Sequence, residues 1–116
     1  MTLQEIIQHQ KEYDAKHSSA FHWDSKISDD NIEMLMFLLT SITGELGETA
    51  NTVKKIVRGD CTLKQSLSHI SEELADIFIY LIKLSYQLGI DLEQVYLEKM
   101  QKNSERFKHY ERTDDR

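Results

Sequence analysis

The chain of 116 residues contains no proline and only four glycines, and this scarcity of helix-breaking residues is what constrains its fold most strongly. Proline and glycine are the residues that most often interrupt a helix. Two of the glycines, Gly59 and Gly89, each follow a long segment whose apolar residues recur at helical spacing, which is where a helix commonly ends. The sequence therefore predicts an all-α protein of long helices joined by short turns.

Four helices are expected along the chain. The sequence Thr2-Leu3-Gln4-Glu5 has the form of a capping box and opens the first helix, and Thr62 or Ser66 opens the third. The expected ranges are about 2–16, 31–58, 62–88 and 91–110, with a loop or a loop with a short turn at 17–30 and a tail at 111–116. Four helices with short connections indicate a four-helix bundle in a single domain, residues 1–116. The apolar surfaces of the second and third helices are too broad for one small bundle, so a homodimer or homotetramer is expected to complete it.

Composition narrows the possible partners. The net charge of −6 argues against a protein that grips a nucleic-acid polymer, which needs clustered lysine and arginine. A nucleotide substrate is still compatible with this charge if metal ions screen its phosphates. Cys61 is the only cysteine, so the chain can form neither an internal disulfide nor a thiolate metal site. The N-terminal segment is too polar for a signal peptide and no run approaches about 18 apolar residues, so no membrane association and a cytoplasmic location are expected.

Two pairs of acids carry the chemistry. Glu45 and Glu48 lie three residues apart in the second predicted helix, and Glu73 and Asp76 have the same spacing in the third. Residues three apart share a helical face, and both pairs border the apolar stripe of their helix. Like charges packed together are tolerated only if protons or cations neutralise them, and an oxygen-only ligand set suits Mg²⁺, with Mn²⁺ as a possible substitute. The alternative, a solvated acidic face, suits Glu72, which points away from the stripe.

The fourth predicted helix supplies cations. Lys99 and Asn103 fall inside its apolar arc, where a polar group is costly unless something polar or anionic meets it. They lie one turn apart and can bind phosphate oxygens, with Arg106 as a third donor. The alternative is that Lys99 extends its ammonium group into solvent and Asn103 bonds a neighbouring backbone group.

Four more residues could contact a nucleotide, and most of them also have a purely structural interpretation. Tyr80 lies one turn after Asp76 and either orients a ligand or fills core space. His22 and Trp23 in the loop either stack on a base or, for the tryptophan, anchor the loop to the core. Lys55, in the basic end of the second helix, either contacts phosphates or complements the helix C-terminus.

The motifs resemble those of the MazG-like all-α nucleoside triphosphate pyrophosphohydrolases, and they look closest to the dCTP pyrophosphatase-like branch. The resemblance covers about residues 31–107 and rests on Gly44-Glu-Leu-Gly-Glu48, Glu72-Glu-Leu-Ala-Asp-Ile-Phe-Ile-Tyr-Leu81, Gly89-Ile-Asp-Leu and Lys99-Met-Gln-Lys-Asn103. It implies that the four acids Glu45, Glu48, Glu73 and Asp76 hold Mg²⁺. It also implies that Lys99 and Asn103 contact the triphosphate, that Tyr80 lies near the nucleotide, and that His22 and Trp23 contribute to base selection.

The predicted function is Mg²⁺-dependent hydrolysis of a (deoxy)nucleoside triphosphate to the monophosphate and pyrophosphate, as in nucleotide-pool housecleaning. Either Glu45 or Glu48 would orient or deprotonate the attacking water. One alternative is a phosphoribosyl-ATP pyrophosphatase-like enzyme, which a substrate panel distinguishes. The other is a non-enzymatic helical module for metal binding or dimerisation, which would release no pyrophosphate from any nucleotide.

Overall fold

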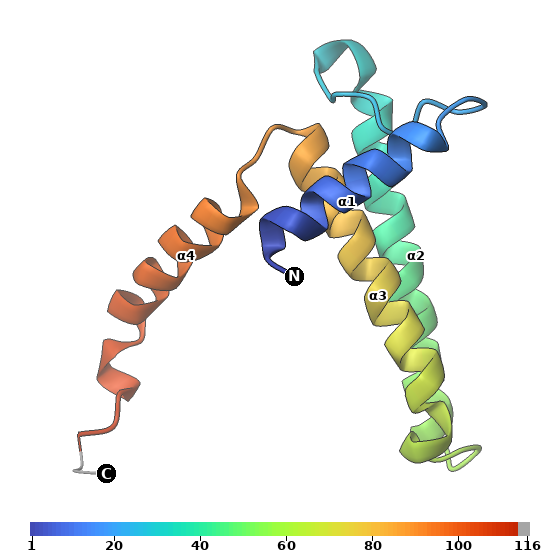
Figure 1. Ribbon diagram of the computed structural model, residues 1–116. Helices are drawn as coiled ribbons and strands as arrows, with labels where there is room; N and C mark the ends of the chain where they lie inside the picture. The colour runs from blue at the N-terminus through green and yellow to red at the C-terminus, as the bar shows by residue number, and fades with distance from the viewer. Residues whose placement is uncertain (114–116) are drawn as a thin grey trace.

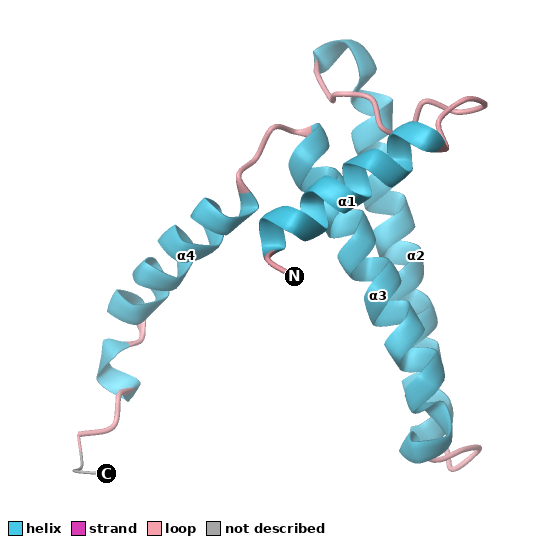
Figure 2. Ribbon diagram, in the orientation of Figure 1, coloured by secondary structure: helices cyan, strands magenta, loops and turns pink. Residues whose placement is uncertain are grey.

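The computed structural model describes residues 1–113, and all of its regular structure is helical (Figure 2). The prediction of an all-α fold is therefore confirmed. The α-helices are α1 (Leu3–Lys16), α2 (Ile32–Val57), α3 (Leu63–Gln87) and α4 (Leu92–Arg106), and the short 3₁₀ turns are η1 (Asp29–Asn31) and η2 (Lys108–Tyr110). Each helix of residues 1–113 is too short or too polar to cross a membrane. The predicted tail at 111–116 is described only as far as residue 113, so its remainder lies outside the described residues.

Local sequence sets where the helices begin and end. The capping box at the start of α1 forms as predicted: the Glu5 amide donates to the Thr2 hydroxyl at 3.1 Å, and the Thr2 amide donates to the Glu5 carboxylate at 2.9 Å. Thr62, one of the two predicted start residues, caps α3 in the same way. Gly59 and Gly89 follow α2 and α3 with φ of 87° and 72°, a left-handed conformation that glycine adopts without steric cost.

The core lies where three elements meet. α2 and α3 form a long antiparallel hairpin, and α1 crosses the C-terminal half of α3 (Figure 1). The loop after α1 returns to the start of α2, and its Ile27 is buried beside Met34 and Leu38 of α2 and Leu84 of α3. The lower part of the hairpin, distal to α1, has no further layer of helices over it (Figure 1).

Helix α4 stands apart from this core. It leaves α3 at a sharp turn around Gly89 and extends away from the hairpin (Figure 1), and none of its residues is buried. The radius of gyration is 18.3 Å, whereas a compact chain of this length has about 13 Å. One copy of the chain thus forms a three-helix unit with an extended arm. Completion of the predicted bundle by a second copy stays a prediction.

Candidate functional site

Three carboxylates from two helices converge near the middle of the α2–α3 hairpin. Glu45 of α2 and Glu73 and Asp76 of α3 each offer one carboxylate oxygen, and these oxygens all lie within 4.8 Å of one another. The three-residue spacing puts both acids of α3 on one face, and the antiparallel packing of α2 brings Glu45 opposite them. The two helices therefore bring together acids from both predicted pairs.

Glu73 is the most perturbed member of this cluster. Its pKa is raised from 4.5 to about 7, first by a hydrogen bond shared with the Glu45 carboxyl group, then by burial and by the negative charges of Glu45 and Glu48. Each of these causes favours the protonated form of a carboxyl group. Glu48, the fourth predicted acid, is thus close enough to act on Glu73 although it is not among the three converging oxygens. Repulsion among these carboxylates raises the free energy of the folded protein, and a bound cation would remove this repulsion.

The residues present fit a divalent cation. Oxygen Oε2 of Glu73 is buried without a hydrogen-bond partner among the described residues, which is unusual for a carboxylate oxygen. A cation would satisfy this oxygen and neutralise the cluster. The donor set contains only carboxylates, which favours Mg²⁺ or Mn²⁺ over the metals that prefer nitrogen or sulfur.

His69 is a neighbour of the cluster that the sequence analysis did not select. Its Nε2 lies 3.7 Å from Oε1 of Glu73, one helical turn away on α3. The imidazole is about half exposed, so it borders the acids without entering the core. Its position four residues before Glu73 was visible in the sequence as an (i, i+4) pair.

A small cavity begins at the acid cluster and runs along α3 toward α1. Its volume is about 160 Å³. Asp76, Tyr80 and Lys83 recur at i, i+4 and i+7 and so lie along one face of α3. The lining residues are Asp76, Ile79, Tyr80 and Lys83 from α3, Gln10, Tyr13 and Asp14 from α1, and Trp23 from the loop. Tyr80 and Trp23, both predicted to lie near a nucleotide, are therefore brought to the same cavity, and that cavity adjoins the acids.

A buried ion pair, which the sequence analysis missed, contributes both of its residues to the lining of this cavity. The Lys83 ammonium nitrogen lies 2.8 Å from Oδ2 of Asp14, and both side chains are almost completely buried. Asp14 also accepts hydrogen bonds from the Gln10 amide group and from the Tyr86 hydroxyl. Burial, followed by the bond to Asp14, raises the pKa of Tyr86, which keeps its phenol protonated as a donor. The signal in the sequence was a lysine inside the apolar run of α3, between Ile82 and Leu84.

The remaining predicted site residues lie elsewhere in one copy of the chain. Lys99, Asn103 and Arg106 belong to α4, which the structure does not pack against α2 or α3. His22 is exposed and does not line the cavity, although its neighbour Trp23 does. Lys55 is exposed on α2, two turns after Glu48 on the same face.

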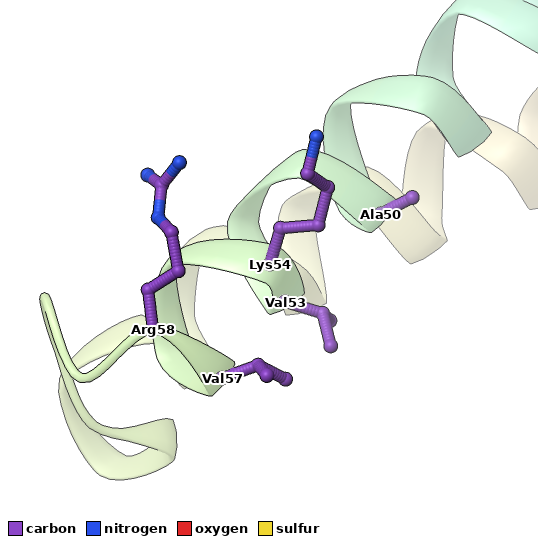
Figure 3. Close-up of a pocket in the computed structure, with 5 residues that line it drawn as sticks. All are labelled: Ala50, Val53, Lys54, Val57 and Arg58. Carbon is purple, nitrogen blue, oxygen red and sulfur yellow. The ribbon is translucent and has the colours of Figure 1, made fainter.

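The outer end of α2 carries a shallow groove of a different character. Ala50, Val53 and Val57 form its apolar part, and Lys54 and Arg58 form its basic edge. The two cationic side chains point to one side of the helix and the valines to another (Figure 3). Val57 is 82% exposed. The groove holds no carboxylate, so it has no part in the acid cluster, and it adds to the uncovered apolar surface of the hairpin.

The family follows from comparison with known proteins. A sequence profile of the MazG nucleotide pyrophosphohydrolase domain matches residues 35–111. The chain belongs to this family. The matched range contains the acid cluster and almost all of α2, together with α3 and α4. The chain is also 34% identical over 82 residues to the Gene 37 protein of Mycobacterium phage L5, an alignment that covers 66% of this chain and 72% of that protein. No solved structure matches the chain.

Membership of the MazG family confirms the resemblance drawn from the sequence motifs and places the chain among the nucleotide pyrophosphohydrolases. The family generally uses a divalent metal, and the cluster of Glu45, Glu73 and Asp76 could bind one. The roles of individual site residues stay predictions.

Proposed function

We propose that the protein hydrolyses a (deoxy)nucleoside triphosphate in a Mg²⁺-dependent reaction. Water adds across the α–β phosphoanhydride bond, and the products are the nucleoside monophosphate and pyrophosphate. The observation that carries this proposal is the convergence of Glu45, Glu73 and Asp76 on a space that suits one cation, within a chain of the MazG family. Mn²⁺ is expected to substitute, because it takes the same oxygen ligands.

Each acid has a defined task in this proposal. Glu73 and Asp76 hold the cation from α3, and Glu45 and Glu48 approach it from α2. When bound, Mg²⁺ would neutralise charge on the phosphates and lower the pKa of a water molecule. Glu45 or Glu48 accepts a proton from the attacking water, since both border the cluster and neither is buried.

The phosphates need cations from the protein as well, and α4 is where the sequence places them. Lys99 and Asn103 would hold phosphate oxygens, with Arg106 beside them. Because α4 extends away from the acids of its own chain (Figure 1), we propose that these residues reach the site in an oligomer, supplied by α4 of a second copy.

The exposed surface supports such an oligomer. The chain exposes 9051 Å², whereas a compact monomer of its mass exposes about 6,600 Å². The excess, about 2,500 Å², is in the range that one partner buries in a permanent interface. Much of it is apolar. Large side chains that are at least two-fifths exposed include Leu46, Val53, Leu67, Leu74 and Phe78 on the hairpin and Val95, Tyr96, Leu97 and Met100 on α4. Both faces are apolar, and the cationic side chains of Lys99 and Arg106 on α4 suit the acids of α2 and α3.

The test is pyrophosphate release from a panel of canonical and modified nucleoside triphosphates, with phosphoribosyl-ATP included, in the presence of Mg²⁺. The wild-type protein should release monophosphate and pyrophosphate in equal amounts from at least one of them. Glu73→Gln should lower the rate on the order of 100-fold or more, a typical loss for a group that stabilises transition-state charge. Glu72→Gln is the matched control, because Glu72 is the exposed neighbour on the same helix. The absence of pyrophosphate with every substrate, or an undiminished rate in Glu73→Gln, would refute the proposal.

A further inference from the structure

We propose that His69 is a positioning residue for the cation site: its imidazole N–H donates to Oε1 of Glu73 and thereby turns Oε2 of the same carboxylate toward the cation. The two residues lie one turn apart on α3, with 3.7 Å between Nε2 of His69 and Oε1 of Glu73. The inference rests on the proposed function for the presence of the cation. It goes further by adding a residue that lies outside the two acid pairs.

The two carboxylate oxygens of Glu73 have different surroundings. Oε1 lies beside the imidazole of His69, whereas Oε2 is buried with no hydrogen-bond partner among residues 1–113. Glu73 as a whole is only 6% exposed, and a buried oxygen of this kind is costly to leave unsatisfied. Oε2 is therefore the oxygen that a cation would satisfy, and Oε1 is the oxygen for which the protein itself provides a neighbour.

The Glu73 carboxylate needs such a neighbour to keep one orientation. The last side-chain torsion of a glutamate has a broad energy profile, so the rotamer alone does not fix the plane of the carboxylate. The negative charges of Glu45 and Glu48 act on Glu73, and without a cation they repel an ionised carboxylate rather than hold it in place. In metal sites, an outer hydrogen-bond donor commonly holds a ligating carboxylate for this reason.

His69 is the one basic side chain of residues 1–113 that lies within ion-pair distance of an acid in the cluster. A lysine or arginine at this place would add a permanent positive charge, which would compete with the cation. A neutral imidazole with its proton on Nε2 donates one N–H and adds no charge. It can therefore orient the carboxylate and leave the negative charge of the cluster to the cation.

The distance between the two side chains can close easily. It is longer than a hydrogen bond of about 3 Å, but the His69 side chain is 55% exposed, so little packing opposes a small rotation of the ring. Hydrogen bonds at a site are often long before its ligand binds, and they shorten in the complex. The chain also shows that a four-residue spacing permits such a bond. The side-chain amides of Gln8, Gln10 and Gln94 donate to the acid four residues later at 3.1, 2.9 and 3.1 Å.

These glutamines define the rescue variant for the experiment. His69→Leu removes the donor and keeps a good helix former, whereas His69→Gln restores an N–H at the same spacing. His9→Leu, which replaces an exposed histidine of α1, is the matched control. The full chain of each variant is titrated with Mn²⁺, and the free ion is followed by its electron paramagnetic resonance signal. Thermal unfolding of each variant is recorded by circular dichroism.

His69→Leu should weaken Mn²⁺ binding by about tenfold or more, the usual effect of losing an outer hydrogen bond to a metal ligand. His69→Gln should recover most of this affinity, and His9→Leu should bind as the wild type does. All three variants should unfold within about 3 °C of the wild type, because the replaced side chains are exposed. In pyrophosphate release, His69→Leu should need about tenfold more Mg²⁺ for half-maximal turnover and should approach the wild-type kcat at saturating Mg²⁺.

A second measurement separates donation by His69 from coordination by His69. Proton–nitrogen NMR of the imidazole in the Mg²⁺-bound wild-type protein shows which ring nitrogen carries the proton, at a fixed pH where the ring is neutral. The His69→Gln spectrum identifies the signal. The proton should be on Nε2. A proton on Nδ1, with Nε2 bound to the ion, would overturn the proposal in favour of a nitrogen ligand. Because this measurement uses the wild-type chain, it tests the proposal even if His69→Leu does not fold.

Equal Mn²⁺ affinity in the wild type and in folded His69→Leu would overturn the proposal. A His69→Gln protein that binds as weakly as His69→Leu would also overturn it. Either result, with Mn²⁺ still bound by the wild type, would leave the proposed function intact. Weakened Mn²⁺ binding in His69→Leu, together with no pyrophosphate release from any triphosphate, would refute the proposed function alone. A wild-type protein that binds no Mn²⁺ would refute both.

Discussion

Removal of one partner from the Asp14–Lys83 pair should destabilise the protein far more than removal of both. The two side chains are at most 4% exposed and their charged atoms lie 2.8 Å apart. Breaking a buried pair of this kind costs about 3–5 kcal/mol, because the remaining charge is left without compensation, whereas replacement of both partners by neutral groups is often close to neutral. Lys83→Met and Asp14→Asn should each fall in that range, and the double variant should lie within about 1 kcal/mol of the wild type.

The measurement is thermal unfolding followed by circular dichroism at one fixed protein concentration, since an oligomer unfolds at a concentration-dependent temperature. At about 4 °C per kcal/mol for a chain of this size, each single variant should lose about 12–20 °C and the double variant only a few degrees. If the losses of the two single variants simply add in the double variant, the two charges do not depend on each other. The reasoning about the pair would then be refuted.

Three further predictions concern the pH dependence of Glu73, the role of Lys99 on α4 and the turn at Gly89. The pKa of Glu73 is raised from 4.5 to about 7, so between these values the metal-free folded protein keeps a proton that the unfolded chain releases. The free energy of unfolding of the metal-free protein should therefore fall as pH rises through this window. The affinity for Mg²⁺, which needs the carboxylate, should rise with pH and level off above about 7. Calorimetry at several pH values checks both. The Glu73→Gln and Lys99→Ala proteins should each be inactive alone. When they are co-refolded in equal amounts, they should recover roughly one quarter of wild-type activity, because half of the dimers are mixed and one of the two sites in each mixed dimer is intact. No recovery would mean that Lys99 does not act across a dimer interface. Gly89→Ala should cost about 1–2 kcal/mol in a thermal melt, because Gly89 has a φ of 72° and no atom lies within 4 Å of the added methyl group.

Local sequence predicted the helices well because each end depends on a few neighbouring residues. Hydroxyl caps at Thr2 and Thr62 and left-handed glycines at positions 59 and 89 act within one turn of the chain. The acid pairs were equally accessible, because a three-residue spacing fixes a shared face before any tertiary contact forms. Their convergence across α2 and α3 follows once the two helices pack as an antiparallel hairpin.

The position of α4 and the role of Lys83 were harder to predict, for different physical reasons. The apolar pattern of α4 predicts that one face is buried but does not say whether the covering surface belongs to the same chain. Lys83 was passed over because its partner Asp14 lies in α1, 69 residues earlier in the sequence. A long-range pair leaves no spacing pattern. The only local sign was that Lys83 is a charged residue in a run that is otherwise largely buried. Lys83 also lies on the same face of α3 as Asp76 and Tyr80, because the three residues are spaced at i, i+4 and i+7.

The central claim is that the carboxylates of α2 and α3 together hold a divalent cation. Direct titration with Mn²⁺, followed by the loss of the electron paramagnetic resonance signal of the free ion, tests it without any substrate. The wild-type protein should bind the ion, and Glu73→Gln and Asp76→Asn should weaken binding by about tenfold or more. Glu72→Gln should bind as tightly as the wild type. Equal Mn²⁺ affinity in all four proteins would contradict the claim.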